Sequence, residues 1–253
     1  MKKYFVFADA HSFYDELSTA LDEEGFDVNN KDHIIISLGD LCDRGPKSRE
    51  ILSFVNSLPE ERKICIIGNH ELLMEDMIKR GIYYNADISN GTMKTAVDIS
   101  ENHDDTIADL KNNKLWNEYK KSWHWYYEIE DYIFVHGWIP CIHRNDRFFT
   151  EYYKPIEDWR NASKKQFEDA TWENGMSAWA HGIREEGKTV FCGHWNTSWG
   201  NCYLHGNGSE RGEDANHNPF IDEGIVALDA STVISHKVNI YVFEVEDNSQ
   251  NLK

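Results

Sequence analysis

Five short apolar runs in this chain each end at an aspartate, an asparagine or a histidine, and this repeated pattern constrains the fold more than any other feature. The runs are rich in β-branched and aromatic side chains, which is typical of buried strands. The residues that follow a buried strand are where α/β folds place their chemistry. The runs and their polar ends are Tyr4–Ala8 with Asp9 and His11, Ile34–Leu38 with Asp40, Ile64–Ile67 with Asn69 and His70, Tyr132–Val135 with His136, and Thr189–Cys192 with His194.

Helices are predicted between the first of these runs. Phe13, Leu17 and Leu21 recur at four-residue intervals and form one apolar stripe, which predicts a helix over 13–24. Two further helices are predicted over 47–57 and 71–80. The alternation of strand and helix is typical of right-handed βαβ units, and it indicates the α/β class.

The side chains that follow the runs favour a site for divalent metal ions. They offer carboxylate and amide oxygens and imidazole nitrogens, and no thiolate is among them. One histidine after a strand is usually a turn residue, but five strand ends with such donors suit a site for two metal ions. In an extended segment, residues two apart point the same way, so Asp9 and His11 can hold one ion together.

Charge and cysteine content restrict the partners and the compartment. The formal net charge is −18 and there is no basic run, so neither nucleic acid nor an anionic membrane is an expected partner. The chain has five cysteines and no CxxC pair, no stretch long enough for a membrane helix and no recognisable signal peptide. We therefore expect a cytoplasmic protein with free thiols.

Taken in order, these motifs resemble those of the calcineurin-like metallophosphoesterases. Within that family, the Asp43-Arg44-Gly45 and Gly68-Asn69-His70-Glu71 forms look like the serine/threonine phosphoprotein phosphatase branch, including its bacterial and phage members. The resemblance covers most of the chain. It implies an α/β fold of two packed mixed β-sheets flanked by helices, a four-layer αββα sandwich, with the metal ions at the strand ends.

The resemblance also implies a role for each matching residue. Asp9 and His11 would hold one ion, Asp40 would bridge it to a second, and the second would be completed by Asn69, His136 and His194. Manganese is the expected metal for both ions, with iron and zinc as alternatives. A hydroxide that bridges the two ions would attack the phosphorus atom. His70 would be the general acid, paired with Asp43, and Arg44 would bind phosphate oxygens.

The remaining segments have weaker patterns. Residues 81–131 are predicted to be a mainly helical insertion within a single domain over 1–253. Near its end, Trp123, Trp125, Tyr127 and Ile129 alternate as in a strand leading into the fourth run. A segment with Asn90-Gly91, Thr92 and Thr95 loosely resembles one in bacterial members of the family. Residues 205–224 are predicted to be a mobile surface loop, and 225–228 and 238–245 to be closing strands of the second sheet.

Two departures from the family pattern bear on substrate. The first motif has Ser12 where the family usually has glycine. Many bacterial members carry Trp-x-Arg, whose arginine is a second phosphate clamp, whereas this chain has Trp172-Glu173-Asn174. Four arginines are candidates to replace it: Arg144, Arg147, Arg160 and Arg184.

Three functions therefore remain open. The first is hydrolysis of phosphomonoesters. The expected substrate is phosphoserine or phosphothreonine in protein, and a small phosphoester is the alternative substrate. The second is hydrolysis of dinucleoside polyphosphates, since the aromatic residues between 116 and 199 can stack on a base. The third is a non-catalytic, metal-stabilised interaction module, against which the pairing of His70 with Asp43 argues.

Overall fold

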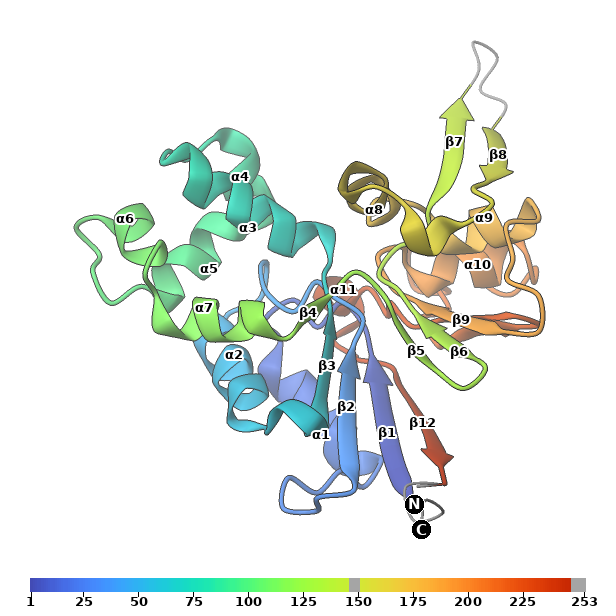
Figure 1. Ribbon diagram of the computed structural model, residues 1–253, viewed down its shortest axis with the longest axis horizontal. Coiled ribbons are helices and arrows are strands. Elements are labelled where there is room, and N and C mark those ends of the chain that lie inside the picture. Colours follow the sequence, from blue (N-terminus) through green and yellow to red (C-terminus); the bar gives the residue numbers. More distant parts are fainter. Residues whose placement is uncertain (146–150, 247–253) are drawn as a thin grey trace.

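Two five-stranded mixed sheets lie face to face in the computed structural model, which describes residues 1–145 and 151–246 (Figure 1). The strand order is β12-β1-β2-β3-β4 in the first sheet and β10-β11-β9-β6-β5 in the second. The first sheet comprises β1 (Lys2–Phe7), β2 (His33–Ser37), β3 (Lys63–Ile66), β4 (Trp123–His124) and β12 (Ile240–Val245). The second comprises β5 (Tyr127–Ile129), β6 (Tyr132–Phe134), β9 (Thr189–Cys192), β10 (Phe220–Asp222) and β11 (Ile225–Ala227).

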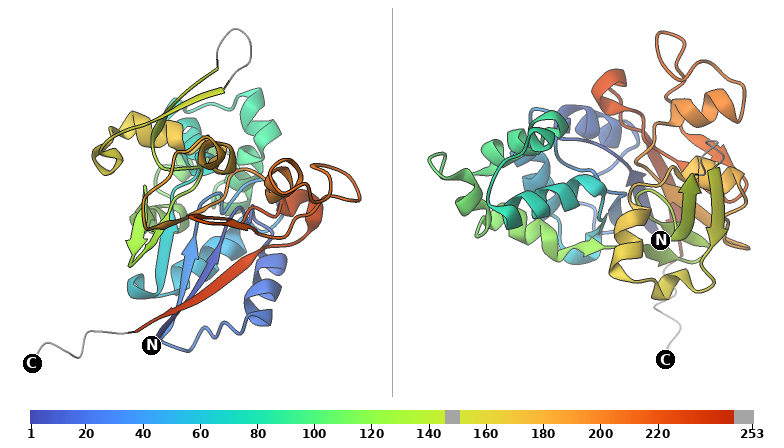
Figure 2. Two further views of the ribbon diagram at one scale, coloured as in Figure 1. Left: turned by 90° about the vertical axis from the view of Figure 1, so that its right-hand side faces the viewer. Right: turned by 90° about the horizontal axis from the view of Figure 1, so that it is seen from above.

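Helices cover the outer face of each sheet. The helices on the side of the first sheet are α1 (Tyr14–Glu23), α2 (Ser48–Ser57), α3 (Asn69–Arg80), α4 (Asn85–Asn90), α5 (Thr92–Ile99), α6 (Thr106–Leu110) and α7 (Lys114–Lys121). On the side of the second are α8 (Lys164–Ala170), α9 (Gly175–Ala180), α10 (Thr197–Tyr203) and a hairpin of β7 (Cys141–Asn145) and β8 (Glu151–Pro155) (Figure 2). A short helix, α11 (Thr232–Ser235), precedes β12. The predicted αββα sandwich is confirmed.

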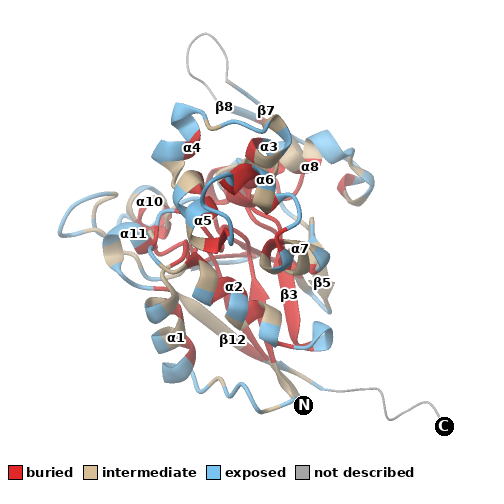
Figure 3. Cartoon of the chain, turned by 90° about the vertical axis from the view of Figure 1, so that its left-hand side faces the viewer, coloured by how far each residue is buried: buried red, intermediate tan, exposed pale blue. Residues whose placement is uncertain are grey.

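Three apolar clusters hold these layers together. The cluster between the sheets includes Val6, Ile36 and Phe134, and Phe134 stacks on Phe191 at 5.1 Å between ring centroids. A second cluster joins the first sheet to its helices, and the predicted stripe of Leu17 and Leu21 is buried in it. The third lies between the second sheet and the helices on its outer side. Burial is accordingly concentrated between the layers, while the outward faces of the helices are exposed (Figure 3).

The five apolar runs form β1, β2, β3, β6 and β9, and their parallel pairing places the polar residues at a common edge. β1, β2 and β3 are parallel neighbours in the first sheet, as are β6 and β9 in the second. β1, β2 and β3 therefore end at one edge of the first sheet, and β6 and β9 at one edge of the second. Hydrogen bonds from His136 to the Leu38 carbonyl and from the His194 N–H to Asp9 bring the two edges together. None of the described helices is both long and apolar enough to cross a bilayer.

Two strand predictions are wrong in their placement. Residues 238–245 were expected in the second sheet, but β12 pairs antiparallel with β1, with Tyr4 opposite Phe243. The alternating segment 123–129 does not form one strand, because β4 pairs with β3 and β5 forms a hairpin with β6. An alternating pattern fixes which face of a strand is buried, but it does not select the neighbouring strand.

Candidate metal and phosphate site

All nine predicted site residues meet where the five strands end. Asp9 and His11 follow β1, and the loop after β2 carries Asp40, Asp43 and Arg44. Asn69 and His70 are the first residues of α3, which is separated from β3 by two residues, and His136 and His194 follow β6 and β9. Seven of the nine side chains are buried, His194 is half-buried and Arg44 is exposed, so the guanidinium faces the open side of the site.

Asp40 lies at the centre of this group. Its Oδ2 atom is 3.9 Å from Nε2 of His11 and 3.9 Å from Nε2 of His70. Its Oδ1 atom is 3.4 Å from Nε2 of His136. One oxygen or nitrogen from each of His11, Asp40 and His70 lies within 4.8 Å of the others, and the same is true of Asp40, His136 and His194. Asp40 therefore belongs to both clusters, which is the position predicted for a bridging ligand.

Backbone carbonyls orient two of the histidines so that the same ring nitrogen faces the cluster. Nδ1–H of His11 donates to the carbonyl of Cys42 at 3.0 Å, and Nδ1–H of His136 donates to the carbonyl of Leu38 at 2.7 Å. In the neutral ring this leaves the lone pair on Nε2, which points at Asp40. Histidine ligands in metalloproteins are held in this way by a hydrogen bond from the other nitrogen.

The donor atoms around His136 fit a divalent cation. Nε2 of His136 is 2.9 Å from Oδ1 of Asn69 and 3.4 Å from Oδ1 of Asp40. With Nδ1–H donating to Leu38, the neutral form of the ring would present its Nε2 lone pair to these two oxygens. A cation at their convergence would satisfy all three, and oxygen and imidazole donors are the ligands that divalent transition metals accept.

Asp9 carries a second sign of a cation site. Its Oδ2 atom accepts a hydrogen bond from the backbone N–H of His194 at 2.9 Å, whereas its buried Oδ1 atom has no hydrogen-bond partner among the described residues. Burial raises the pKa of Asp9 well above its usual range, and the negative charges of Asp229 and Asp40 raise it further. Buried carboxylates in mutual repulsion are stabilised by a bound divalent ion.

The ring protonation also suits metal binding. Burial lowers the pKa of His11 to about 3 and that of His194 to about 3, so both rings are neutral near pH 7, the form that binds metals. Burial alone would raise the pKa of Asp40, but the neighbouring histidines outweigh it and hold that pKa below its usual value. Asp40 is therefore a carboxylate.

His70 forms the predicted pair with Asp43. Its Nδ1–H donates to Oδ2 of Asp43 at 2.7 Å, and Nη2 of Arg44 donates to its Nε2 atom at 3.0 Å. Burial acts to lower the pKa of His70, but the charges of Asp40 and Asp43 and the hydrogen bond to Asp43 outweigh it, so the pKa is raised. A raised pKa is what a group that donates a proton near neutral pH needs.

Thr92 and Thr95 hold Asp43 in place, and sequence reasoning did not assign them this role. Their hydroxyls donate to the two oxygens of Asp43, each at 2.7 Å, and the Asp43 N–H donates to the Thr95 hydroxyl at 2.9 Å. Gly91 lies against the Arg44 backbone, where a Cβ would be 2.3 Å from the Arg44 nitrogen. The resemblance at Asn90-Gly91 drew attention to this segment but did not predict these contacts.

Glu71 and Asp229 are further residues whose roles the sequence did not show. The Glu71 carboxylate accepts hydrogen bonds from the N–H groups of Asp40, Leu41 and Gly68, at 2.8 to 2.9 Å, and so joins the loops after β2 and β3. Asp229, after β11, is buried, and burial raises its pKa to about 6. Its charge raises the pKa of Asp9, and the two residues are far apart in the sequence, so no local motif predicts this interaction.

The loops of the site use a strained backbone. Six of the nine predicted residues have a positive φ, which side-chain-bearing residues rarely adopt and which costs about 1–3 kcal/mol each. Two glycines also let the backbone lie against the aspartates of the site. A Cβ on Gly68 would lie 2.2 Å from Oδ1 of Asp40, and a Cβ on Gly193 would lie 2.2 Å from Oδ2 of Asp9. Ser12 is accommodated with φ 61°, and its hydroxyl contacts that of Ser48 at 2.7 Å. The residues with positive φ are Asp9, His11, Asp40, Asp43, Arg44 and His194.

Of the four candidate replacements for the missing arginine, two are committed elsewhere. Arg160 is paired with Glu128 and Glu185, and Arg184 lies over the Trp179 ring. Arg144 lies in β7, and Arg147 is outside the described residues. Asn174, which stands in the arginine position of the family pattern, instead caps α9 by accepting from the Ser177 N–H.

A cavity of about 310 Å³ beside the cluster is lined by an arginine that was not among the four candidates for the second phosphate clamp. Its lining includes His11, Arg44 and His194 from the site, together with Trp195 and Arg211. Arg211 lies in the 205–224 loop, and its guanidinium is 86% exposed and 3.7 Å from the Glu210 carboxylate. A second cavity, of about 660 Å³, is lined by Asn69 and Trp172 among others. Two hollows therefore adjoin the cluster.

Comparison with known proteins agrees with this arrangement. The family model described as calcineurin-like phosphoesterase matches residues 2–224. A symmetrical bis(5'-nucleosyl)-tetraphosphatase of Psychromonas ingrahamii is 46% identical over 68 residues, which are 27% of this chain and 24% of that protein. The asymmetrical bis(5'-nucleosyl)-tetraphosphatase PrpE of Bacillus subtilis is 32% identical over 74 residues, 26% of this chain and 30% of that protein. The chain thus matches under a third of the length of these relatives.

Two solved structures share the fold over nearly the whole chain. A putative diadenosine tetraphosphatase has a TM-score of 0.56 at 15% identity, and the match covers 96% of this chain and 89% of that one. The cold-active protein tyrosine phosphatase of a psychrophilic Shewanella species has a TM-score of 0.53 at 16% identity, covering 96% and 76%. At such identities the likeness concerns the fold.

Proposed function

The chain belongs to the calcineurin-like phosphoesterase family, and on this premise we propose that it hydrolyses phosphomonoesters at the cluster around Asp40, with phosphoserine or phosphothreonine in protein as the preferred substrate. The observation that carries the proposal is the convergence of lone pairs from Asp40, Asn69 and His136 next to the His70–Asp43 pair. A metal site alone would not need an oriented histidine with an exposed guanidinium beside it.

The proposed ligands fall into two sets that share Asp40. Asp9 and His11 would hold one divalent ion, and Asn69, His136 and His194 the other, with manganese as the expected metal and iron or zinc as alternatives. Two such ions supply positive charge that binds the phosphate oxygens and lowers the pKa of water to about 7, which provides a nucleophile at neutral pH. The chain itself orients the rings of His11 and His136 and keeps those of His11 and His194 neutral.

His70 is proposed to donate a proton to the leaving oxygen. Asp43 fixes the ring by accepting from Nδ1–H, so the transferable proton is carried on Nε2, the atom that faces the open side beside Arg44. In the structure Arg44 donates to that same nitrogen. Protonated His70 and Arg44 would repel each other there, so a phosphate group that draws the guanidinium away would leave Nε2 free to carry its proton.

Arg44 and Arg211 are proposed to bind the phosphate and its surroundings. Both guanidinium groups line the cavity beside His11 and His194, and a guanidinium offers a planar fork that matches phosphate oxygens. Arg211 would serve in place of the arginine that the Trp172-Glu173-Asn174 segment lacks. The net charge of −18 makes such local cations important for any phosphate ligand.

Hydrolysis of dinucleoside polyphosphates is the second candidate. Two observations favour it: relatives matched over about a quarter of their length carry that name, and Trp195 is 37% exposed in the cavity, where its ring can stack on a base. Against it, the chain's negative charge repels a polyanionic dinucleotide more than a single phosphate dianion.

The test is a comparison of kcat/KM for a phosphothreonine peptide and diadenosine tetraphosphate, with the same metal and ionic strength. We expect the peptide to be preferred. A preference of more than about 100-fold for the dinucleotide, about 2.7 kcal/mol in transition-state free energy, would establish the second candidate instead. Absence of turnover of p-nitrophenyl phosphate with added manganese would reject both in favour of the non-catalytic module.

A further inference from the structure

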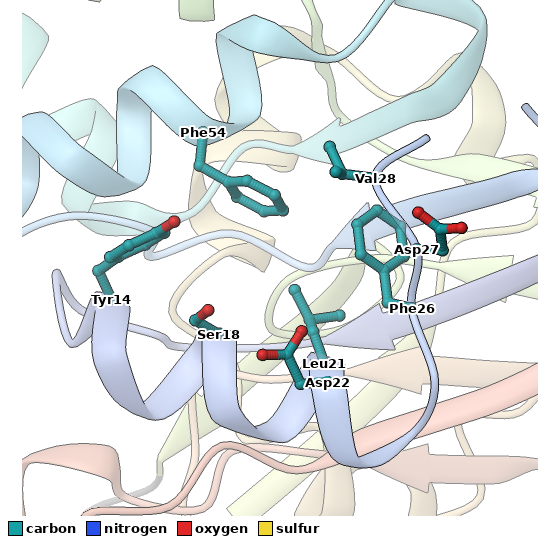
Figure 4. Close-up of a pocket in the computed structure, with 8 residues that line it drawn as sticks. All are labelled: Tyr14, Ser18, Leu21, Asp22, Phe26, Asp27, Val28 and Phe54. Atoms are coloured by element: carbon teal, nitrogen blue, oxygen red, sulfur yellow. The ribbon is translucent and has the colours of Figure 1, made fainter. Parts of the chain in front are cut away.

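A cavity of about 440 Å³ lies between α1 and α2, away from the metal cluster (Figure 4). Its walls are apolar: Tyr14 and Leu21 from α1, Phe26 from the following loop, and Phe54 from α2. Figure 4 shows the Phe54 ring pointing from α2 toward α1. Pockets of this size with mostly aromatic and aliphatic walls are typical of sites that bind small molecules.

The polar groups of this cavity are acidic or neutral. Asp22 on α1 and Asp27 on the following loop, both exposed, line it together with the hydroxyls of Tyr14 and Ser18. The Asp22 carboxylate has no ion-pair partner among the described residues. The Asp27 carboxylate accepts a hydrogen bond from the backbone N–H of Asn29 and forms no ion pair in the described part of the chain. A ligand here would therefore meet two negative charges that the protein leaves unneutralised.

Two cations of the surrounding segments, Arg62 and Lys3, donate to backbone carbonyls. Arg62 lies 6.0 Å from the Phe26 ring centroid and donates to the carbonyls of His33 and Val28. Lys3 donates to the carbonyl of Glu24. Neither lines the cavity, so they do not supply a counter-charge inside it.

From the aromatic walls and the acidic rim, we propose that this cavity is a binding site for a small amphipathic cation, a molecule with an apolar or aromatic body and one ammonium or amidinium group. The body would fill the space between Leu21, Phe26 and Phe54. The charged group would lie at the rim beside Asp22 and Asp27. Ring faces there add cation–π attraction to the ion pairing.

The site is built on the two helices that leave the catalytic loops. α1 begins three residues after His11, and α2 begins four residues after Arg44. The loops are joined by hydrogen bonds from the Gly45 N–H to the His11 carbonyl at 2.8 Å and from the Lys47 N–H to the Ser12 carbonyl at 3.0 Å. The cavity is nevertheless lined by none of the site residues, so its occupancy can be measured independently of hydrolysis.

The test uses two probes with the same body, 4-phenylbutylammonium and the neutral 4-phenylbutanol, titrated by calorimetry into the manganese-loaded protein. We expect the ammonium to bind about fivefold more tightly than the alcohol, since exposed ion pairs contribute up to about a factor of five. The Asp22→Asn/Asp27→Asn variant should reduce this difference to less than twofold. Glu23→Gln, a matched change on α1 whose side chain does not line the cavity, should preserve it.

Substitutions of Phe54, which lines the cavity, test whether the probes bind there. Phe54→Ala should lower the affinity for both probes about tenfold, and Phe54→Leu, which retains more of the apolar side chain, should lower it less. Circular dichroism verifies that each variant is folded. Equal affinity of the two probes, no binding at millimolar concentration, or binding unchanged in both Phe54 variants would overturn the proposal. Dimerisation in sedimentation that Phe54→Ala abolishes would assign the cavity to a second copy and would also overturn it.

Discussion

Nδ1 of His70 lies 2.7 Å from Oδ2 of Asp43, and this contact connects the start of α3 to the loop after β2. It fixes the ring so that Nε2 faces the open side of the metal cluster, where Arg44 also lies. The same contact, with the charge of Asp40, raises the pKa of His70. The geometry and the electrostatics of this pair therefore both suit proton donation to a leaving group.

His70→Asn is expected to lower kcat about 10²–10⁴-fold for phenyl phosphate, because general acid catalysis is worth about that much. The loss should be much smaller for p-nitrophenyl phosphate, whose leaving group needs little protonation. Steady-state kinetics on both esters, with metal content measured in parallel, checks this. Equal losses for the two esters would remove His70 from the acid role.

Thr92→Val/Thr95→Val is expected to lower kcat at least about tenfold, and more for phenyl phosphate than for p-nitrophenyl phosphate. The substitutions preserve side-chain shape but leave the buried Asp43 carboxylate without two donors, a loss of about 1–3 kcal/mol for each group left unsatisfied. Thr106→Val, a change at another buried threonine of the same helical region, should leave both rates near wild type. An equal effect of the two variants would show that Thr92 and Thr95 do not position the acid.

That the nine candidate residues would lie near one another was predictable because each lies in a segment that follows a strand, and strand ends can be read from local hydrophobic pattern. The resemblance then supplied an expected role for each. Thr92 and Thr95 lie about fifty positions from Asp43 along the chain, so nothing local indicated their contacts. Arg211 was likewise missed, since its loop has no pattern that places it beside Arg44.

The limits of the fold prediction have a similar cause. Apolar alternation identified 238–245 as a strand, but either sheet could have accepted it. Its place beside β1 is set by packing, since Phe243 stacks on Tyr4 at 4.9 Å and meets Tyr132 from the second sheet at 4.8 Å. Such pairings depend on the assembled sandwich and cannot be read from one segment.

Gly68→Ala is expected to abolish metal binding and turnover. The new Cβ would lie 2.2 Å from Oδ1 and 2.6 Å from the backbone nitrogen of Asp40, so the carboxylate would have to move. Gly25→Ala, at a glycine with φ 79° and open surroundings, should cost about 1 kcal/mol of unfolding free energy and leave metal content unchanged. Metal analysis and thermal unfolding distinguish the two, and normal metal content in Gly68→Ala would contradict the close approach.

Arg211→Gln is expected to lower kcat/KM about tenfold or more for phosphate esters while leaving metal content unchanged, because one of the two guanidinium groups that line the cavity is removed. Arg184→Gln is the matched control, since Arg184 lies over Trp179 and does not line that cavity. Inorganic phosphate should also inhibit Arg211→Gln more weakly. Equal inhibition in both variants would exclude Arg211 from phosphate binding.

The most direct test of the account is the metal content of the protein and of two aspartate variants, with anomalous scattering to locate the ions. We predict two divalent ions per chain, one on each side of Asp40. Asp40→Asn should lose metal, whereas Asp43→Asn, a matched change at a buried aspartate that bonds His70 and none of the six proposed metal ligands, should retain both ions. Two ions retained in Asp40→Asn, or ions located away from Asp40, would contradict the account.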